Sequence, residues 1–191
     1  MPRVGLTRDR VAAVAADLVD ETGFETLSLS AVAKRVGVSQ PALYKHVPGL
    51  DALRRDVAVL AVGELAGILH DARAGLHGRD ALRAVCAAYR GYATAHPGRA
   101  AASVRAPAPG DADHATVGAA AAGELLAVLA DYGIGDDEEG VHAVRQIRAC
   151  LHGFVTLEAA GGFGLPESVD ETFARLVDAL DVAFAARTDG R

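Results

Sequence analysis

Several residue types and patterns are scarce or missing from this 191-residue chain. It has no tryptophan and one methionine, and no alternating apolar pattern predicts a β-strand. No apolar run is long enough to cross a membrane, and the start MPRVGLTRDR lacks the apolar stretch of a signal peptide. The missing strand pattern favours a helical protein. Because membrane and signal-peptide segments are also missing, we expect the protein to be cytoplasmic.

Patterns that would indicate catalysis or metal binding are also missing. Cys86 and Cys150 are far apart and belong to no metal or redox motif, so we expect reduced core residues, with a redox or disulfide role as the alternative. His70 and His77 lie two helical turns apart without a third ligand, and the glycine-rich stretch 161–164 lacks the preceding strand of a phosphate-binding loop. Because no Ser-His-Asp or Cys-His arrangement is present, we expect no catalytic residue, metal or cofactor.

The charge of the chain is distributed unevenly. The formal net charge is -6, yet residues 1–56 hold eight Lys and Arg against seven Asp and Glu, a net of +1. The other 135 residues hold eleven against eighteen, a net of -7. The only two lysines are Lys34 and Lys45. This balance excludes a protein that coats nucleic acid indiscriminately. It predicts weak non-specific binding to DNA, so that high affinity requires a matching DNA site bound by two copies of the protein at once.

The lysines lie in a segment, LSAVAKRVGVSQPALYKHV, that has the pattern of two short helices joined by a tight turn. Ser28 is placed to cap the first helix, and Gly37 suits the strained backbone at its end. The apolar stripe of the first helix, spaced i, i+3, i+4 and i+7, consists of Leu29, Val32, Ala33 and Val36.

The second helix of this segment carries an unusual outward face. It begins at Ser39, with Pro41 in its first turn, where a missing amide proton matters little. Leu43 and Val47 are expected to face inward. The outward side offers hydrogen-bond donors, a methyl group and two rings, which suit base edges and phosphates, at Gln40, Ala42, Tyr44, Lys45 and His46. A helical hairpin inside an ordinary bundle is the alternative, but it would not need such a face.

At these residues the chain resembles the TetR family of bacterial repressors. The resemblance includes a preceding helix, Thr7 to Thr22, closed by Gly23-Phe24, and it continues into PGLDAL after the motif. A second stretch, His152 to Pro166, is similar to the helix and loop of one subgroup's regulatory domain.

The resemblance implies roles for individual residues. Lys45 and His46 would meet bases or phosphates, and Ser30 would reach DNA from the first helix of the motif. The full set of DNA-binding residues implied in this way is Ser30, Ser39, Gln40, Pro41, Ala42, Tyr44, Lys45 and His46. Many members have a phosphate-binding lysine where this chain has Leu50, and Arg54 or Arg55 could replace it.

The rest of the chain has helical periodicity throughout. We expect an all-α fold, with a three-helix helix-turn-helix DNA-binding domain at 1–50 and a helical ligand-binding and dimerisation domain at 51–191. Pro107, Pro109 and Gly110 mark a loop after a short helix through Ser103 and Arg105. The longer helices are expected at about 53–75, 79–96, 113–132, 136–160 and 168–187.

The last two expected helices have wide apolar faces, which favour dimerisation over a monomer core. The resemblance implies a four-helix bundle across a twofold axis, and symmetry would then make the DNA site a short inverted repeat. The residues expected at the dimer interface are Ile147, Leu151, Phe154, Phe173, Leu176 and Leu180.

Ligand-binding residues are expected on the helix near 79–96. Tyr89, Tyr92 and His96 fall at i, i+3 and i+7 and could line a mainly apolar pocket with polar tips. Ordinary core packing is the alternative for the same residues.

These features together predict a homodimeric transcriptional repressor that binds a palindromic operator and releases it when a small-molecule effector binds. Repression itself enters by resemblance. Two other classes stay open: a helical ligand-binding or interaction module that no longer reads DNA, and an all-helical enzyme.

Overall fold

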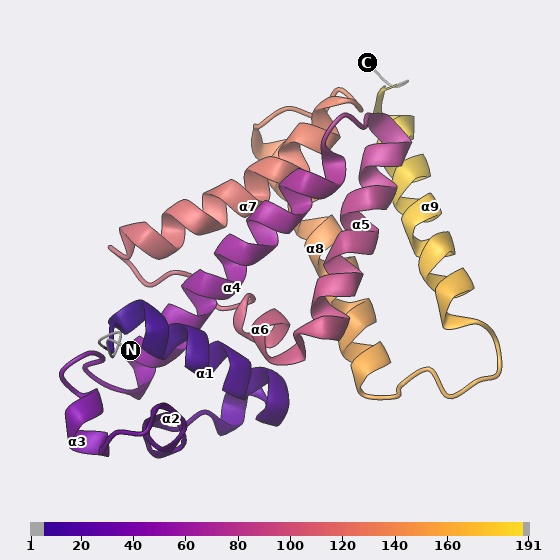
Figure 1. The fold of residues 1–191 in the computed structure, drawn as a ribbon. Coiled ribbons are helices and arrows are strands. Elements are labelled where there is room, and N and C mark those ends of the chain that lie inside the picture. Colours follow the sequence, from indigo (N-terminus) through magenta and orange to yellow (C-terminus); the bar gives the residue numbers. More distant parts are fainter. Residues whose placement is uncertain (1–5, 189–191) are drawn as a thin grey trace. The chain divides into compact units, whose positions relative to one another are not determined.

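The computed structural model describes residues 6–188, and all its regular elements in this range are helical, which confirms the all-α expectation (Figure 1). The first five residues of MPRVGLTRDR therefore lie outside the described part. Among the described residues, no helix has the length and apolar character of a membrane span. The elements are α1 (Arg8–Thr22), the 3-10 helix η1 (Phe24–Thr26), α2 (Leu29–Val36), α3 (Gln40–Leu43), α4 (Leu50–Arg73), α5 (Gly78–Ala95), α6 (Pro97–Ala102), α7 (Ala112–Ala130), α8 (Glu138–Ala159) and α9 (Val169–Thr188).

The helices form two compact units. The first unit contains the residues up to Glu64 together with His96–Gly118, and the second contains Leu65–Ala95 together with the residues from Ala119 on. Two helices, α4 and α7, begin in the first unit and continue into the second. The expected DNA-binding domain, 1–50, stays a prediction, and the compact unit that holds it is larger.

Local capping explains where the N-terminal helices begin and end. The Thr7 side chain accepts a hydrogen bond from the amide of Arg10, and the Ser28 side chain accepts one from Ala31, so each supplies a partner that a first helical turn lacks. Gly37 ends α2 with a φ of 75°, the left-handed conformation expected for it. The buried faces of these helices and of the first turns of α4 form one core that includes Val11, Val19, Val32, Leu43, Val47, Leu53 and Val57.

The short helix between α5 and α7 corrects one expectation. It spans Pro97–Ala102 and ends before Ser103, because Pro97 begins a helix at the point where it stops α5. Gly98 is buried where α6 meets α1, and a Cβ built on it would lie 2.1 Å from the carbonyl oxygen of Val19. The first unit therefore includes a helix crossing that only glycine fits.

The second unit is built on α5, α8 and α9, which lie side by side (Figure 1). Its interior contains Leu82, Ile147 and Phe184, none of which has solvent-exposed surface. Cys86 is buried there as a free thiol, and burial raises its pKa to about 12. Cys150 is also a free thiol.

Candidate nucleic-acid interface

Backbone hydrogen bonds after α2 hold α3 at a tight turn. The amide of Val38 donates to the carbonyl of Ala33 (3.0 Å), which closes the end of α2 around Gly37. Ser39 takes the N-cap position of α3, although its side chain makes no capping hydrogen bond. After Leu43 the chain continues in tight turns, in which the amide of Val47 donates to the carbonyl of Leu43 (3.1 Å). The regular part of the second helix is thus shorter than its apolar spacing suggested.

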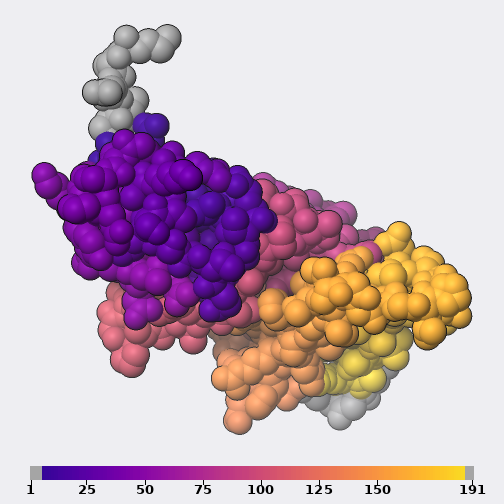
Figure 2. Space-filling view, turned by 90° about the horizontal axis from the view of Figure 1, so that it is seen from below, coloured from indigo at the N-terminus to yellow at the C-terminus, as the bar shows by residue number. Residues whose placement is uncertain are grey.

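The side chains of this segment divide into an inner and an outer set. Leu43 and Val47 are 1% and 0% exposed, as expected for the inner set. Tyr44 is 50% exposed, which is unusual for a large aromatic side chain. The other residues assigned to the DNA face are exposed or half-buried: Ser30, Ser39, Gln40, Pro41, Lys45, Ala42 and His46. Figure 2, seen from below, shows the surface that the N-terminal helices form.

The two lysines are cations without an internal partner. The side-chain ammonium groups of Lys34 on α2 and Lys45 after α3 have no hydrogen bond or ion pair to any residue within 6–188, and both side chains are exposed. Arg35, next to Lys34, instead donates from Nη1 to Glu21 Oε1 at 2.9 Å. Both ammonium groups can therefore meet phosphates without first breaking a salt bridge.

The candidate replacements for a phosphate-binding lysine at Leu50 are both engaged. Arg54 Nη2 donates to the carbonyl of Glu25 (3.1 Å), and its side chain is 25% exposed. Arg55 lies in a network of carboxylates and is 22% exposed. Neither guanidinium is free in the way that Lys34 and Lys45 are.

The residues expected to bind a ligand fall into different units. Tyr89 and Tyr92 lie on α5 in the second unit and are 7% and 6% exposed. The Tyr89 hydroxyl lies 3.2 Å from Nδ1 of His152 on α8, a partner that the sequence did not indicate. Burial, with a smaller effect of Arg148, keeps the pKa of His152 below its ordinary value, which favours the neutral ring.

His96 does not continue this stripe, because α5 ends at Ala95 and His96 is the N-cap residue of α6. It belongs to the first unit, where its Nδ1 lies 2.9 Å from Asp20 Oδ2 on α1. Its assignment to the ligand set stays a prediction.

The residues expected at a dimer interface already have partners within the second unit. Phe154 packs edge-on against Phe173 with 5.0 Å between ring centroids, and the guanidinium of Arg90 lies 4.9 Å from the Phe173 ring. Leu176 is half-buried, and the others are at most 8% exposed: Ile147, Leu151, Phe154, Phe173 and Leu180. The exposed large apolar residues on α8 and α9 are instead Val141, Leu157 and Val182.

Other sequence features have structural explanations. His70 and Arg73 both bind Glu124 through side-chain contacts, and the stretch 161–164 connects α8 with α9. Between residues 6 and 188, no group of three or more His, Cys, Asp or Glu side chains is arranged to hold a metal ion.

Sequence reasoning missed two features that geometry brings into view. Lys34 was not assigned to the DNA face, although its being one of only two lysines was a usable signal. His152 could not be connected with Tyr89, since the two lie 63 positions apart and no local pattern joins them.

Two family models match the chain. Residues 12–57 match "Bacterial regulatory proteins, tetR family", and residues 82–180 match "Tetracyclin repressor-like, C-terminal domain". Proteins of these families are transcriptional regulators, not enzymes.

Individual proteins agree with these matches. The chain is 38% identical over 159 residues to the HTH-type transcriptional regulator Rv0681 of Mycobacterium tuberculosis. The matched residues cover 82% of this chain and 72% of that protein. It is 30% identical over 173 residues to the HTH-type transcriptional regulator YobS of Bacillus subtilis, covering 91% and 90%. A TetR variant of Acinetobacter baumannii in complex with minocycline shares the fold, with a TM-score of 0.72, 22% identity and coverage of 96% and 99%. The chain therefore belongs to the TetR family of transcriptional regulators.

Proposed function

We propose that this regulator binds a short inverted-repeat operator as a homodimer, represses transcription there, and is released by a small-molecule effector. Cytoplasmic action follows from this proposal, because the operator lies on DNA. The observation that carries it is the outer face of the α2–α3 segment, which combines an exposed tyrosine with two unpaired lysines.

Base reading is assigned to the start of α3. Gln40 is exposed at the first position of α3, and an amide side chain can bond two positions on a base edge. Tyr44 adds a ring and a hydroxyl, while Pro41 and Ala42 offer apolar contacts to thymine methyl groups. Ser30, Ser39 and His46 lie around this centre with polar atoms that can meet bases or phosphates.

Phosphate binding is assigned to Lys45 and, in addition, to Lys34. These contacts supply affinity that depends on salt, whereas the α3 contacts supply sequence preference. Because the whole chain carries -6, we expect non-specific binding to fail at moderate salt while operator binding persists.

The proposed dimer surface uses the exposed sides of α8 and α9. Val141 and Leu157 on α8 and Val182 on α9 are 44%, 52% and 66% exposed. Small exposed residues surround Val182 on α9 and would let a second copy approach closely: Ala179, Ala183 and Ala186. Twofold symmetry would then place two α3 segments in successive major grooves, about 34 Å apart.

The effector is assigned to the second unit, where Tyr89, Tyr92 and the partner His152 offer polar groups within an apolar interior. A ligand-bound fold relative, the minocycline complex, supports a small molecule as the class of effector. For near-complete release, the effector must favour the DNA-incompetent conformation by about 5 kcal/mol.

The test of DNA reading is selection of bound duplexes from a random pool by the purified chain at two salt concentrations. Recovery of one inverted repeat that survives higher salt supports the proposal. Loss of all binding as salt rises, with no common motif, would identify a ligand-binding module instead.

Variants then separate base contacts from phosphate contacts. Tyr44→Ala should weaken operator binding by about tenfold or more with the fold intact, and Lys45→Ala should weaken all duplexes and lower the salt slope by about 1 per protomer. Arg83→Ala is the matched control, because it removes one positive charge from an exposed side chain on α5, and its partner Asp178 keeps the contact with Arg79. Operator affinity unchanged by Tyr44→Ala would remove Tyr44 from the site.

Two further variants test the dimer and the effector site. Val182→Asp should yield monomers in analytical ultracentrifugation, and a persistent dimer would move the interface elsewhere. Tyr92→Phe should alter effector response while leaving operator binding intact, whereas loss of folding would assign Tyr92 to the core.

A further inference from the structure

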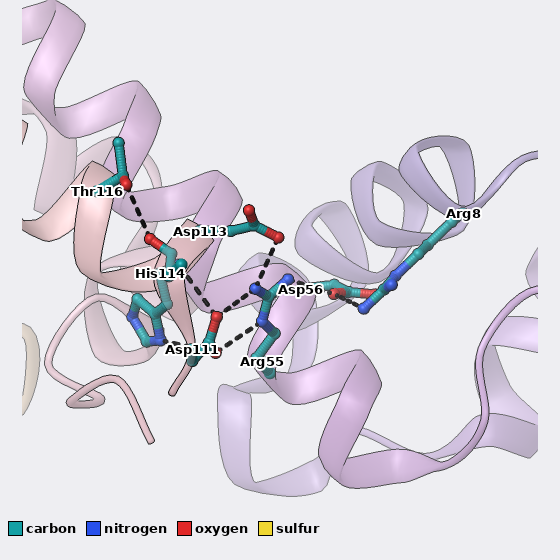
Figure 3. A network of polar contacts seen from close by, with 8 residues as sticks. Arg8, Arg55, Asp56, Asp111, Asp113, His114 and Thr116 are labelled. Atoms are coloured by element: carbon teal, nitrogen blue, oxygen red, sulfur yellow. Dashed lines mark hydrogen bonds and ion pairs between the residues drawn. The ribbon is translucent and has the colours of Figure 1, made fainter. Parts of the chain in front are cut away.

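A cluster of charged side chains in the first unit connects α4 with two other segments (Figure 3). Arg55 donates from Nε to Asp111 Oδ2 (2.8 Å), and its Nη2 binds both Asp111 and Asp113. Its Nη1 lies 3.3 Å from Asp56 Oδ1. One guanidinium thus meets three carboxylates, of which Asp111 lies just before α7 and Asp113 lies in its first turn.

The same cluster extends to α1. Arg8 forms a two-pronged contact with Asp56, from Nε to Oδ2 at 2.7 Å and from Nη2 to Oδ1 at 2.6 Å. Asp56 is 6% exposed and Asp111 is 14% exposed, so water screens their charges only partly. The first turns of α4 therefore bind α1 on one side and the segment before α7 on the other.

We propose that Arg55 is a positioning residue for DNA reading: it holds α4, and through α4 the α3 segment, in the geometry that fits an operator. This inference rests on the operator binding proposed above. It also assigns Arg55 a role other than replacing the phosphate-binding lysine absent at Leu50.

The packing shows how Arg55 would act on α3 without touching DNA. Leu53 and Val57, on either side of Arg55, have no exposed surface and belong to the same core as Leu43 and Val47. Because cores are close-packed, a shift of α4 moves the side chains that seat α3. Loss of Arg55 would lower the fraction of molecules whose α3 is correctly placed.

The charges argue against a phosphate contact. Hydrogen bonds to Asp111 hold the pKa of Arg55 above its ordinary value, and Arg55 in turn lowers the pKa of Asp111. Three carboxylates around the guanidinium would repel an approaching phosphate. To reach DNA, the Arg55 side chain would have to break its contacts with Asp56, Asp111 and Asp113. The carboxylates would then have fewer positive partners, which costs free energy.

The experiment measures operator affinity against salt concentration for the full chain and for Arg55→Met, Arg55→Lys and Asp111→Asn, using the selected inverted repeat as probe. Arg55→Met should lose at least about tenfold in affinity at fixed salt, with the wild-type salt slope retained. Arg55→Lys keeps the charge but not the two-pronged contact, so it should recover only part of the loss.

Asp111→Asn is the decisive variant, because it makes the protein more positive. A purely electrostatic effect would tighten DNA binding, whereas a positioning role predicts weaker binding. Tighter or unchanged binding by Asp111→Asn overturns the inference, as does a salt slope that falls by about 1 per protomer in Arg55→Met.

Two readouts keep other causes apart. Circular dichroism reports folding, and if both Arg55→Met and Asp111→Asn fail to fold, Arg55 serves the fold and the inference is overturned. If the wild-type chain selects no operator, the proposed function fails instead, whereas wild-type binding with unaffected variants refutes the positioning role alone.

Discussion

Replacing Gly98 by alanine tests the closest helix crossing in the first unit. A Cβ at this position would lie 2.1 Å from the carbonyl oxygen of Val19, 2.2 Å from its carbonyl carbon and 2.6 Å from the amide nitrogen of Asp20. All three are backbone atoms, which no rotamer change can move aside. The two helices must therefore separate or tilt, and that loosens the contacts around them.

The expected loss can be worked from these distances. A carbon atom needs more than about 3 Å from such neighbours, so α6 must move by about 1 Å, and overpacking of this kind costs about 1–3 kcal/mol. Alanine gains up to about 1 kcal/mol in helix propensity, which reduces the net effect. A net loss of about 1 kcal/mol would lower the melting temperature by about 2–4 °C in a chain of this length.

The assay is thermal unfolding followed by circular dichroism, with Gly91→Ala as the matched control. Gly91 lies on α5, and a Cβ there would meet no atom within 4 Å. Gly91→Ala should therefore raise stability by about 0.5–1 kcal/mol through helix propensity alone. If Gly98→Ala melts at or above the wild-type temperature, the close α1–α6 crossing does not exist and the reasoning is refuted.

Three further predictions concern buried groups and pH. Phe184→Ala should cost about 3–5 kcal/mol in a urea titration, because Phe184 has no exposed surface, and a loss below about 1 kcal/mol would contradict its place in the core. Tyr132→Phe removes a hydroxyl that donates to Asp181 at 2.6 Å and should cost about 1.5–3 kcal/mol, whereas unchanged stability would mean that water replaces the bond. His114 is 2% exposed, and burial keeps its pKa below the ordinary value, so as pH falls through about 6.5 the unfolded chain takes up a proton that the folded chain resists. The melting temperature should therefore fall between about pH 7.5 and about pH 5.5, with part of the slope retained in His114→Gln because His152 shifts the same way; an identical slope in that variant would exclude His114.

Local signals placed most of the helices correctly. Ser28 and Gly37 occupy the two ends of α2 as their chemistry predicts, because capping and left-handed backbone depend on near neighbours alone. Errors arose where one residue has two local roles. Pro97 stops α5 and also starts α6, so an interpretation that used only the stop displaced the short helix toward Ser103.

In the candidate site too, some features could be predicted from local spacing and others depend on tertiary packing. The outward positions of Gln40 and Tyr44 follow from their spacing relative to Leu43 and Val47, since one turn of helix sets which side chains share a face. That Lys45 is unpaired while Arg54 and Arg55 are engaged could not be known, because ion-pair partners are chosen by packing between distant segments.

Local patterns in the chain were sufficient to predict the helical fold and the helix-turn-helix, with its family, since periodicity, caps and motif residues act over a few positions. Tertiary packing determined which residues contact each face of a helix. The apolar faces of α8 and α9 fill the interior of the second unit, so residues such as Ile147 and Phe173 are core residues, and Val182 is exposed instead. Packing likewise joined Arg55 to Asp111 across 56 positions. Periodicity states that a face is apolar or charged, but only the folded chain sets which surface covers it.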